Sequence, residues 1–481
     1  MRQRFLLLLA LLGLPATLRG QDLAARIEDL VRTYHEQGRF TGAVLVGWKG
    51  RVIYKEGMGY ANAEWKVRNG PGVRVRIGSL TKAFTAMLVL QLVDEGKLRL
   101  GGTISEYLPA YPLPAGDHVT LHQLLSHTSG IPDYVELPLF QPVRNRQPTR
   151  PAQFLATFDS LPFNFVPGRR YAYSNSGYFI LGVILEQVTG RTWAELLRER
   201  ILEPLGMQRT GYDDGTAVIP GRAEGYLQTL GGLRPADFLD MSLMYSAAGM
   251  YSTLDDLWRF DRALSERRLL SDSAYALMEG LQARTATGWY GYGWAVDRVF
   301  VGAGRDSLTS VSHVGGVPGF TAANFRLPED DGVILWYDNT GQVPPLSQEI
   351  VKLLYGVPVV PPRPSIARAL LPVVKEAGVE TAIRQYRDVR ARRPDAYDFA
   401  ERELNQLGYA LLRGGAVRDA VAIFTLNTEM YPAGSNTYDS LGEALLAAGD
   451  TAGAVANYRR SLAMNAGNTN ATRVLARLGQ R

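Results

Sequence analysis

One stretch near the start of the chain reads Gly78-Ser-Leu-Thr-Lys-Ala-Phe-Thr-Ala-Met-Leu-Val-Leu-Gln-Leu-Val-Asp-Glu-Gly96. The part from Leu80 to Glu95 is apolar on nearly every face and stops at a glycine, so it predicts a buried helix. Ser79 and Lys82 stand at its beginning, and residues three apart share one face of a helix. We therefore expect the Ser79 hydroxyl and the Lys82 amine to meet at the N-terminus of a core helix.

A serine in contact with a lysine has the chemistry of a nucleophile and its activating base. A serine hydroxyl is a weak nucleophile until a neighbouring group accepts its proton. Burial lowers the pKa of a lysine, which lets the amine take that proton, and a helix N-terminus favours a developing oxyanion. The motif alone is weak, because on the order of one Ser-x-x-Lys is expected by chance in a chain this long. The motif is more significant here because a lysine is almost never buried in so apolar a helix unless its charge is paired or used.

Residues predicted to form strands lie on both sides of a mostly helical region. The predicted strands are Gly42–Gly47, Arg51–Lys55, Tyr292–Val296, Ser310–Gly315, Thr321–Leu327 and Val333–Tyr337. The helices predicted between them, besides the one already described, are Phe179–Val188, Trp193–Arg200 and Asp255–Leu264. We predict an α/β fold of the α+β kind, with one antiparallel sheet built from both ends of the domain and a helical insert packed against it.

The C-terminal quarter of the chain has a different character. The segment 357–364 is rich in proline and predicts a stiff extended linker. Beyond it, Leu407-Gly408, Ala420 and Phe424 recur 34 residues later as Leu441-Gly442, Ala454 and Tyr458. This period is similar to the tetratricopeptide repeat, in which each helical hairpin buries its face against its neighbour. We predict a repeat domain over 365–481, with a plain helical bundle as the alternative, and a protein partner or a second copy of the chain as its ligand.

The N-terminus predicts export from the cytoplasm. Two arginines precede an apolar run from Phe5 to Leu14, and small residues follow, which is typical of a secretory signal peptide over residues 1–20. The alternative is an uncleaved anchor. The chain has no cysteine, which excludes disulfides, thiolate catalysis and a lipoprotein anchor. We expect a secreted or periplasmic protein without a stable membrane span after cleavage. The formal net charge is +5, with Lys and Arg scattered, so no nucleic-acid partner is expected.

From about residue 39 to residue 355 the chain resembles the β-lactamase-related serine hydrolases, which include class C β-lactamases, D-alanyl-D-alanine carboxypeptidases and esterases. The shared motifs are, in chain order, Ser79-Leu-Thr-Lys82, Leu124-Leu-Ser-His-Thr-Ser-Gly130, Pro167-Gly-Arg-Arg-Tyr-Ala-Tyr-Ser-Asn-Ser-Gly-Tyr178, Ala248-Gly-Met-Tyr-Ser-Thr253 and His313-Val-Gly-Gly316. Their order and spacing are more specific than any single motif. The resemblance implies a β-lactamase/transpeptidase-like fold over residues 21–356.

The resemblance also implies a role for each site residue. Ser79 would be acylated, and Tyr173 together with Lys82 would act as the general base and later return the proton. Asn175 would orient the substrate amide. The N–H groups of Ser79 and Gly316 would form the oxyanion hole. A ligand could approach it closely because Gly315 and Gly316 have no side chains. Tyr60 and Tyr337 also stand two residues before an asparagine, and Tyr173 is preferred for its flanking motif.

Two histidines in these motifs receive different interpretations. His313 stands where many members carry a lysine, and it would present positive charge to a substrate carboxylate only conditionally; the alternative is a hydrogen-bonded strand histidine. His127 is interpreted as structural, through hydrogen bonds to the backbone.

These observations predict a serine hydrolase that uses no cofactor or metal and acts on a small D-amino-acid peptide, lactam or ester. The alternatives are an esterase without peptide or lactam activity, and a catalytically idle module that carries the helical repeats.

Overall fold

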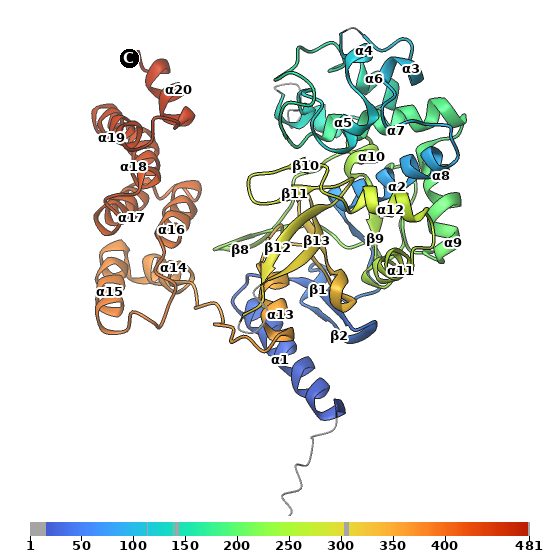
Figure 1. Cartoon of the computed structure of the whole chain (residues 1–481). Helices are drawn as coiled ribbons and strands as arrows, with labels where there is room; N and C mark the ends of the chain where they lie inside the picture. Colours follow the sequence, from blue (N-terminus) through green and yellow to red (C-terminus); the bar gives the residue numbers. More distant parts are fainter. Residues whose placement is uncertain (1–15, 113, 138–139, 141–143, 303–306, 480–481) are drawn as a thin grey trace, which may run out of the picture. The chain divides into compact units, whose positions relative to one another are not determined.

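The structure is a computed structural model that describes residues 16–112, 114–137, 140, 144–302 and 307–479. The chain divides into two compact units (Figure 1). One consists of Met1–Leu227 and Pro235–Val360, and the other of Gln228–Arg234 and Pro361–Arg481. The break after Val360 falls inside the proline-rich segment 357–364, whose role as a linker stays a prediction.

The first unit is built on an eight-stranded antiparallel sheet. In spatial order its strands are β10 (Ala283–Arg284), β11 (Trp289–Tyr290), β12 (Ala295–Phe300), β13 (Ser307–Val317), β14 (Phe320–Leu327), β15 (Gly332–Asp338), β1 (Gly42–Trp48) and β2 (Arg51–Met58). Leu45 of β1 lies opposite Leu335 of β15 on one side and Lys55 of β2 on the other. Strands from the two ends of the unit therefore share one sheet, which confirms the predicted architecture.

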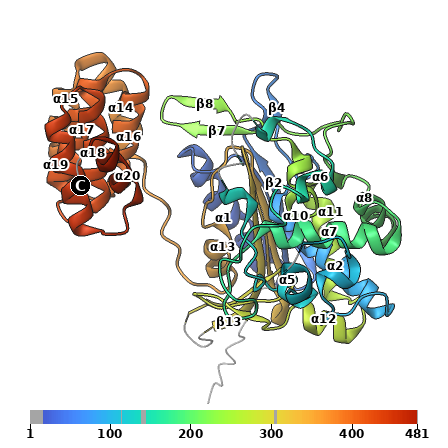
Figure 2. The same cartoon turned by 90° about the horizontal axis from the view of Figure 1, so that it is seen from above.

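Helices cover both faces of this sheet (Figure 2). α1 (Ala16–Glu36) and α13 (Leu346–Leu354) lie on one face, where Ile27, Val44 and Ile350 are buried together. The other face is covered by the insert. Its helices are α2 (Thr81–Asp94), α3 (Ile104–Tyr107), α4 (Ala115–His118), α5 (Leu121–Leu125), α6 (Pro151–Leu155), α7 (Asn175–Thr189), α8 (Trp193–Leu197), α9 (Glu203–Leu205), α10 (Tyr245–Ala248), α11 (Leu254–Ser265) and α12 (Asp272–Met278). α2 lies within the larger core, and most of its residues are buried.

Shorter strands lie outside the eight-stranded sheet. They are β3 (Tyr60–Asn62), β4 (Val67–Arg68), β5 (Val75–Arg76), β6 (Gly211–Tyr212), β7 (Tyr226–Thr229), β8 (Gly232–Pro235) and β9 (Met250–Ser252). β7 pairs with β8, and Gln228–Arg234 belong to the second unit. β9 pairs with β5, directly before the Gly78–Leu80 segment, and the Met250 N–H donates to Thr81 Oγ1 at 3.2 Å. The Ala248–Thr253 motif thus holds the beginning of α2 in place.

Most predicted elements differ from the observed ones by a few residues at their ends, and two of these differences lie next to Ser79 and Lys82. Gly78–Leu80 form a 3₁₀ turn ahead of α2, so Ser79 lies in this turn and not in the α-helix. The strand predicted over Tyr292–Val296 begins only at Ala295. The cause lies at Gly293, whose φ is +80° and where a Cβ would lie 2.7 Å from Ala83 Cα, so the backbone turns there against α2.

The predicted signal peptide stays a prediction. Residues 1–15 lie outside the described residues, and residues 16–20 form the start of α1. Within the described part of the chain, no helix has the length and hydropathy that crossing a bilayer requires.

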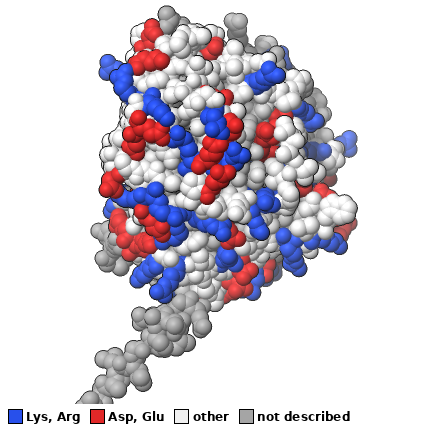
Figure 3. All heavy atoms as spheres, turned by 90° about the vertical axis from the view of Figure 1, so that its right-hand side faces the viewer, with Lys and Arg blue, Asp and Glu red and all other residues white. Residues whose placement is uncertain are grey.

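The surface of the first unit mixes charges of both signs. Figure 3 shows acidic and basic side chains interspersed over the described residues of one face, without a band of a single sign. The exposed ion pairs of this unit include Arg200–Glu95 and Lys55–Asp255. Each such pair is worth about 1 kcal/mol or less.

The C-terminal part of the second unit is helical. Its helices are α14 (Ile366–Ala377), α15 (Val379–Arg392), α16 (Glu401–Arg413), α17 (Val417–Met430), α18 (Ser435–Ala447), α19 (Thr451–Met464) and α20 (Thr469–Arg477). The repeated residues make repeated contacts: a Cβ at Gly408 would lie 2.6 Å from the Phe424 ring, and one at Gly442 would lie 3.2 Å from the Tyr458 ring. Glycine thus lets each pair of helices approach closely. Assignment to the tetratricopeptide class stays a prediction.

Candidate active site

The Ser79 hydroxyl and the Lys82 amine meet as the sequence predicts. Lys82 Nζ lies 3.1 Å from Ser79 Oγ. Ser79 is partly exposed, whereas Lys82 is completely buried. The 3₁₀ turn provides this geometry, because it places Ser79 one turn before Lys82 on the same side of the chain. Solvent can therefore reach the Ser79 hydroxyl but not the Lys82 amine that is paired with it.

The other contacts of Lys82 fix the direction of its hydrogen bonds. Nζ also lies 2.7 Å from Asn175 Oδ1 and 3.0 Å from the Ala247 carbonyl oxygen. Both oxygens can only accept a hydrogen bond. A neutral amine has two N–H groups, and these two oxygens use both. The remaining lone pair then points at Ser79 Oγ, which is the arrangement that proton transfer from the serine requires.

Burial makes the neutral form of Lys82 accessible. It lowers the pKa of the Lys82 amine to about 7, while the negative charge of Asp133 acts in the opposite direction. The aromatic rings of Tyr173 and Tyr178 lie 4.7 and 5.6 Å from Nζ and complete its surroundings. A large fraction of Lys82 is thus neutral near pH 7.

Tyr173 lies next to both residues, with its ring near Lys82 and its hydroxyl hydrogen-bonded to Ser79. Burial raises the pKa of the Tyr173 phenol, and a hydrogen bond with Ser79 opposes this only in part. The phenol therefore stays protonated and acts as a donor at neutral pH. Of the two residues, only Lys82 has its pKa brought close to neutrality, and their joint role as general base stays a prediction.

Asn175 is held by a residue that the sequence prediction missed. Its Nδ2 donates to Asp133 Oδ2 at 2.9 Å, which turns Oδ1 toward Lys82. Asp133 is only 8% exposed, and burial raises the pKa of its carboxyl. It stands three residues after the Leu124–Gly130 motif, and this position is the one signal in the sequence that would have identified it.

His127 holds the segment that carries Tyr173, in agreement with the structural role that we expected. Its Nδ1 accepts from the Ser174 N–H at 3.1 Å, and its carbonyl oxygen accepts from the Ala172 N–H at 2.8 Å. The residues directly before and after Tyr173 in the chain are therefore both hydrogen-bonded to His127. The His127 ring also packs against the Tyr173 ring, with centroids 4.3 Å apart. Its φ is +58°, an unusual conformation for histidine.

β13 brings a backbone N–H next to Ser79. Pro318 and Gly319 form a two-residue loop between β13 and β14, with Val317 opposite Phe320 and Gly316 opposite Thr321. Because successive residues of an antiparallel strand direct their N–H groups to opposite edges, the Gly316 N–H points away from β14. A Cβ at Gly78 would lie 2.5 Å from Gly316 N, so this edge lies against the Ser79 turn. The N–H groups of Ser79 and Gly316 are thus placed to form an oxyanion hole.

The closest approach occurs at Gly315. A Cβ there would lie 1.9 Å from the Ile77 carbonyl oxygen and 2.7 Å from Ser79 N, whereas a Cβ at Gly316 would meet only the Phe320 carbonyl oxygen at 4.0 Å. We predict that Gly315→Ala pushes β13 away from Ser79. It should lower the stability by about 1–3 kcal/mol and kcat/KM by about 10²-fold. The melting temperature measures the loss of stability, and ester hydrolysis measures the loss of kcat/KM. Gly316→Ala is the matched control and should leave the melting temperature unchanged; equal destabilisation by both substitutions would contradict this packing.

His313 is a hydrogen-bonded strand histidine, as the alternative interpretation had it. Its Nε2 lies 3.0 Å from the Tyr290 hydroxyl, and its Nδ1 lies 2.9 Å from the Val314 carbonyl oxygen. Since a carbonyl only accepts, Nδ1 carries the proton and Nε2 accepts from Tyr290. Burial, together with the charge of Lys82, lowers the pKa of His313 to about 3. The ring is therefore neutral and provides no positive charge for a substrate carboxylate.

A cavity of about 360 Å³ opens beside Ser79. Its lining residues are Ser79, Val135, Phe140, Asn145, Asn175, Asp237, Phe238, Leu239, Met244, Ala248, Gly316, Val317 and Pro318. Among the residues that the structure describes, no three His, Asp or Glu side chains are grouped as ligands for a metal ion.

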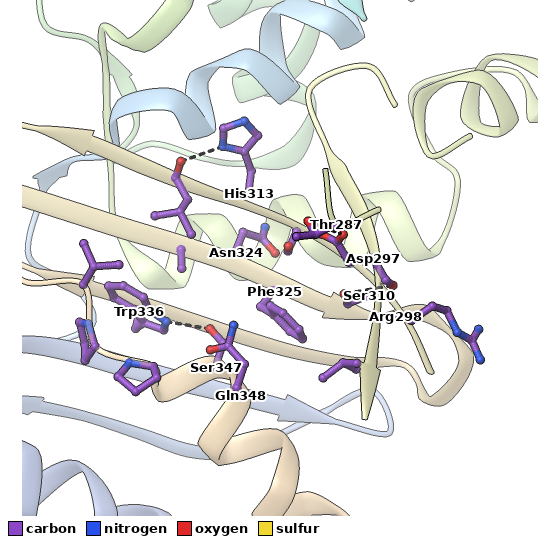
Figure 4. Close-up of a pocket in the computed structure, with 17 residues that line it drawn as sticks. Thr287, Asp297, Arg298, Ser310, His313, Asn324, Phe325, Trp336, Ser347 and Gln348 are labelled. Carbon is purple, nitrogen blue, oxygen red and sulfur yellow. Dashed lines mark hydrogen bonds between the residues drawn. The ribbon is translucent and has the colours of Figure 1, made fainter. Parts of the chain in front are cut away.

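A second cavity, of about 500 Å³, lies between the sheet and the residues that lead into α13 (Figure 4). It shares no lining residue with the first. Trp336 Nε1 donates to Ser347 Oγ at 2.9 Å in its wall, and Figure 4 shows the His313 ring pointing away from this pair. The second cavity is thus separate from Ser79.

Comparison with known proteins agrees with this arrangement. The family described as beta-lactamase matches residues 27–350. The chain belongs to the beta-lactamase family. The resemblance found in the sequence is thereby confirmed, and with it membership of a family of serine hydrolases.

Three relatives show the range of this family. The chain is 26% identical to penicillin-binding protein 4* of Bacillus subtilis, covering 76% of this chain and 82% of that protein. It is 29% identical to a D-aminopeptidase of Gluconobacter oxydans, covering 71% of this chain and 64% of that protein. Among solved structures, the octameric penicillin-binding protein homologue from Pyrococcus abyssi superposes with a TM-score of 0.60 at 27% identity, covering 73% of this chain and 81% of that one.

Proposed function

We propose that this protein hydrolyses small amides or esters through an acyl-enzyme formed on Ser79. The observation that carries the proposal is the hydrogen bonding of Lys82: Asn175 Oδ1 and the Ala247 carbonyl oxygen take its two N–H groups and leave its lone pair for Ser79 Oγ. The family supports it, because one relative is a D-aminopeptidase. A D-amino-acid amide or peptide is therefore one candidate class of substrate, beside simple esters.

The proposed reaction follows from the positions of these groups. Lys82 takes the proton of Ser79 as Oγ attacks the substrate carbonyl carbon. The resulting oxyanion accepts hydrogen bonds from the N–H groups of Ser79 and Gly316. The Tyr173 phenol donates a proton to the leaving atom as its bond to carbon breaks, and the proton held by Lys82 replaces it. Water then attacks the acyl-enzyme by the reverse sequence, which frees Ser79 and completes hydrolysis.

A panel of three substrate classes tests the proposal: a chromogenic short-chain ester, a D-Ala-D-Ala peptide and nitrocefin. We expect the purified protein to hydrolyse at least one of them, with a covalent adduct formed by a fluorophosphonate. An idle module would hydrolyse none and form no adduct. Turnover without an adduct would contradict the serine mechanism.

The pKa of Lys82 predicts the pH dependence. The base must be neutral, so kcat/KM should rise tenfold per pH unit below about 7 and level off above it. The ionisable side chains around the Lys82 amine are those of Asp133, His127, His313, Tyr173 and Tyr178. Of these, Asp133 raises the pKa of Lys82, so Asp133→Asn should move the rise to lower pH. Ester hydrolysis between pH 5 and 9 measures the profile, with recovery of activity after acid exposure as the control. A rise centred near pH 10 would contradict a buried amine as the base.

A further inference from the structure

We propose that the cavity beside Ser79 binds the acyl part of the substrate, that this acyl part is bulky and apolar, and that the leaving group carries no carboxylate. This inference rests on the proposed function and specifies the substrate class of the same site. It distinguishes among the peptide, lactam and ester substrates that the sequence leaves open.

The position of Tyr173 assigns the two sides of the site. The proton for the leaving atom comes from the Tyr173 phenol, so the leaving group must lie on the Tyr173 side of Ser79. Neither Tyr173 nor His313 lines the 360 Å³ cavity, whereas Ser79, Asn175 and Gly316 do. We therefore place the acyl part of the substrate in this cavity and the leaving group at the Tyr173 phenol.

The wall of the cavity selects the chemistry of that acyl part. Phe140, Phe238, Leu239 and Met244 are lining residues, and Val135, Val317 and Pro318 add further apolar surface. Phe238 is 54% exposed, so an aromatic group placed against it would remove apolar area from water. A volume of this size accommodates a phenyl ring. An acetyl group would leave most of this surface uncovered.

No Lys or Arg is found among the described residues that line the cavity. Asp237 is the one charged residue among the described residues that line the cavity. On the leaving-group side, both ring nitrogens of His313 are engaged, with the Tyr290 hydroxyl and the Val314 carbonyl oxygen. A carboxylate placed there would lose its hydration without gaining an ion pair from His313, which costs free energy. Peptides that end in a carboxylate next to the scissile bond, and lactams with a carboxylate on the ring, are therefore poor substrates.

Three esters with closely matched structures test the proposal on the full chain. They are methoxycarbonylmethyl phenylacetate, carboxymethyl phenylacetate, which differs only in a carboxylate on the leaving group, and methoxycarbonylmethyl acetate, which differs only in the acyl group. Chromatography of the released phenylacetate or acetate gives kcat/KM. We expect the first ester to be preferred by about tenfold or more over each of the others. An equal or faster reaction of the carboxymethyl ester, or of the acetate ester, would overturn the proposal.

Substitution of the cavity wall links the preference to its proposed cause. Phe238→Ala should lower kcat/KM for the phenylacetate ester by about tenfold and leave the acetate ester within about twofold. Trp65→Ala is the control, because Trp65 is an aromatic residue that is 83% exposed and does not line the cavity. An equal effect of Phe238→Ala on both esters would overturn the assignment of the cavity to the acyl part.

The outcomes also separate this inference from the function on which it rests. If Ser79 were labelled but the preference among the three esters were reversed, the proposed substrate class would be wrong while the proposed hydrolase function would stand. No reaction with any ester together with no labelling of Ser79 would contradict the hydrolase itself.

Discussion

Ser79→Ala is expected to reduce ester hydrolysis by about 10⁴-fold or more. The substitution removes the oxygen that attacks the carbonyl, and the other groups of the site cannot replace it. Steady-state kinetics on a chromogenic ester measures the loss.

The fold should survive this change. Ser79 is partly exposed, and its hydroxyl hydrogen-bonds to the side chains of Lys82 and Tyr173, neither of which needs this bond for its place in the core. Circular dichroism and the melting temperature should therefore match those of the unaltered protein within a few degrees. Hydrolysis within tenfold of the original rate by a correctly folded Ser79→Ala protein would show that a different residue is the nucleophile.

Tyr173→Phe is expected to lower kcat/KM by about 10²–10⁴-fold, the usual contribution of a general acid or base. The phenylalanine ring preserves the packing against His127, with centroids 4.3 Å apart, and removes only the hydroxyl that hydrogen-bonds to Ser79. The loss should be larger for an amide or alkyl ester than for a nitrophenyl ester, because a nitrophenolate leaves without a proton.

Tyr171→Phe provides the matched control. Tyr171 also packs against His127, with ring centroids 5.8 Å apart, but lies outside the hydrogen bonds around Ser79 that the structure gives. Its substitution should change kcat/KM by less than about threefold. If Tyr173→Phe were nearly silent on an alkyl ester, Lys82 would be the sole proton-transfer group and the role of the phenol would be wrong.

The fold was predictable because its main signals are local. The turn between Thr321–Leu327 and Val333–Tyr337 separates two runs of β-forming residues, and these became β14 and β15. The apolar run after Ser79 became α2. The strand predicted over Tyr292–Val296 was wrong at Tyr292–Trp294 because of a tertiary contact. Gly293 turns the backbone there against Ala83, and the local sequence pattern does not indicate this contact.

The site was predictable only where motifs mark it. Ser79, Lys82, Asn175 and Gly316 lie together as the resemblance implies, and Tyr173 hydrogen-bonds to Ser79. Asp133 was missed because its role depends on how the side chain of Asn175 turns, which only the folded chain defines. The state of His313 likewise depends on the Tyr290 hydroxyl, a partner 23 residues away. The signal peptide and the repeat class stay predictions.

Covalent labelling tests the central claim most directly. The purified chain is treated with a fluorophosphonate at pH 8, and its intact mass and proteolytic peptides are then measured. We predict one adduct per chain, on the peptide that contains Ser79, and no adduct on the Ser79→Ala protein. An unlabelled native chain, or an adduct at another residue, would contradict an activated serine at this position.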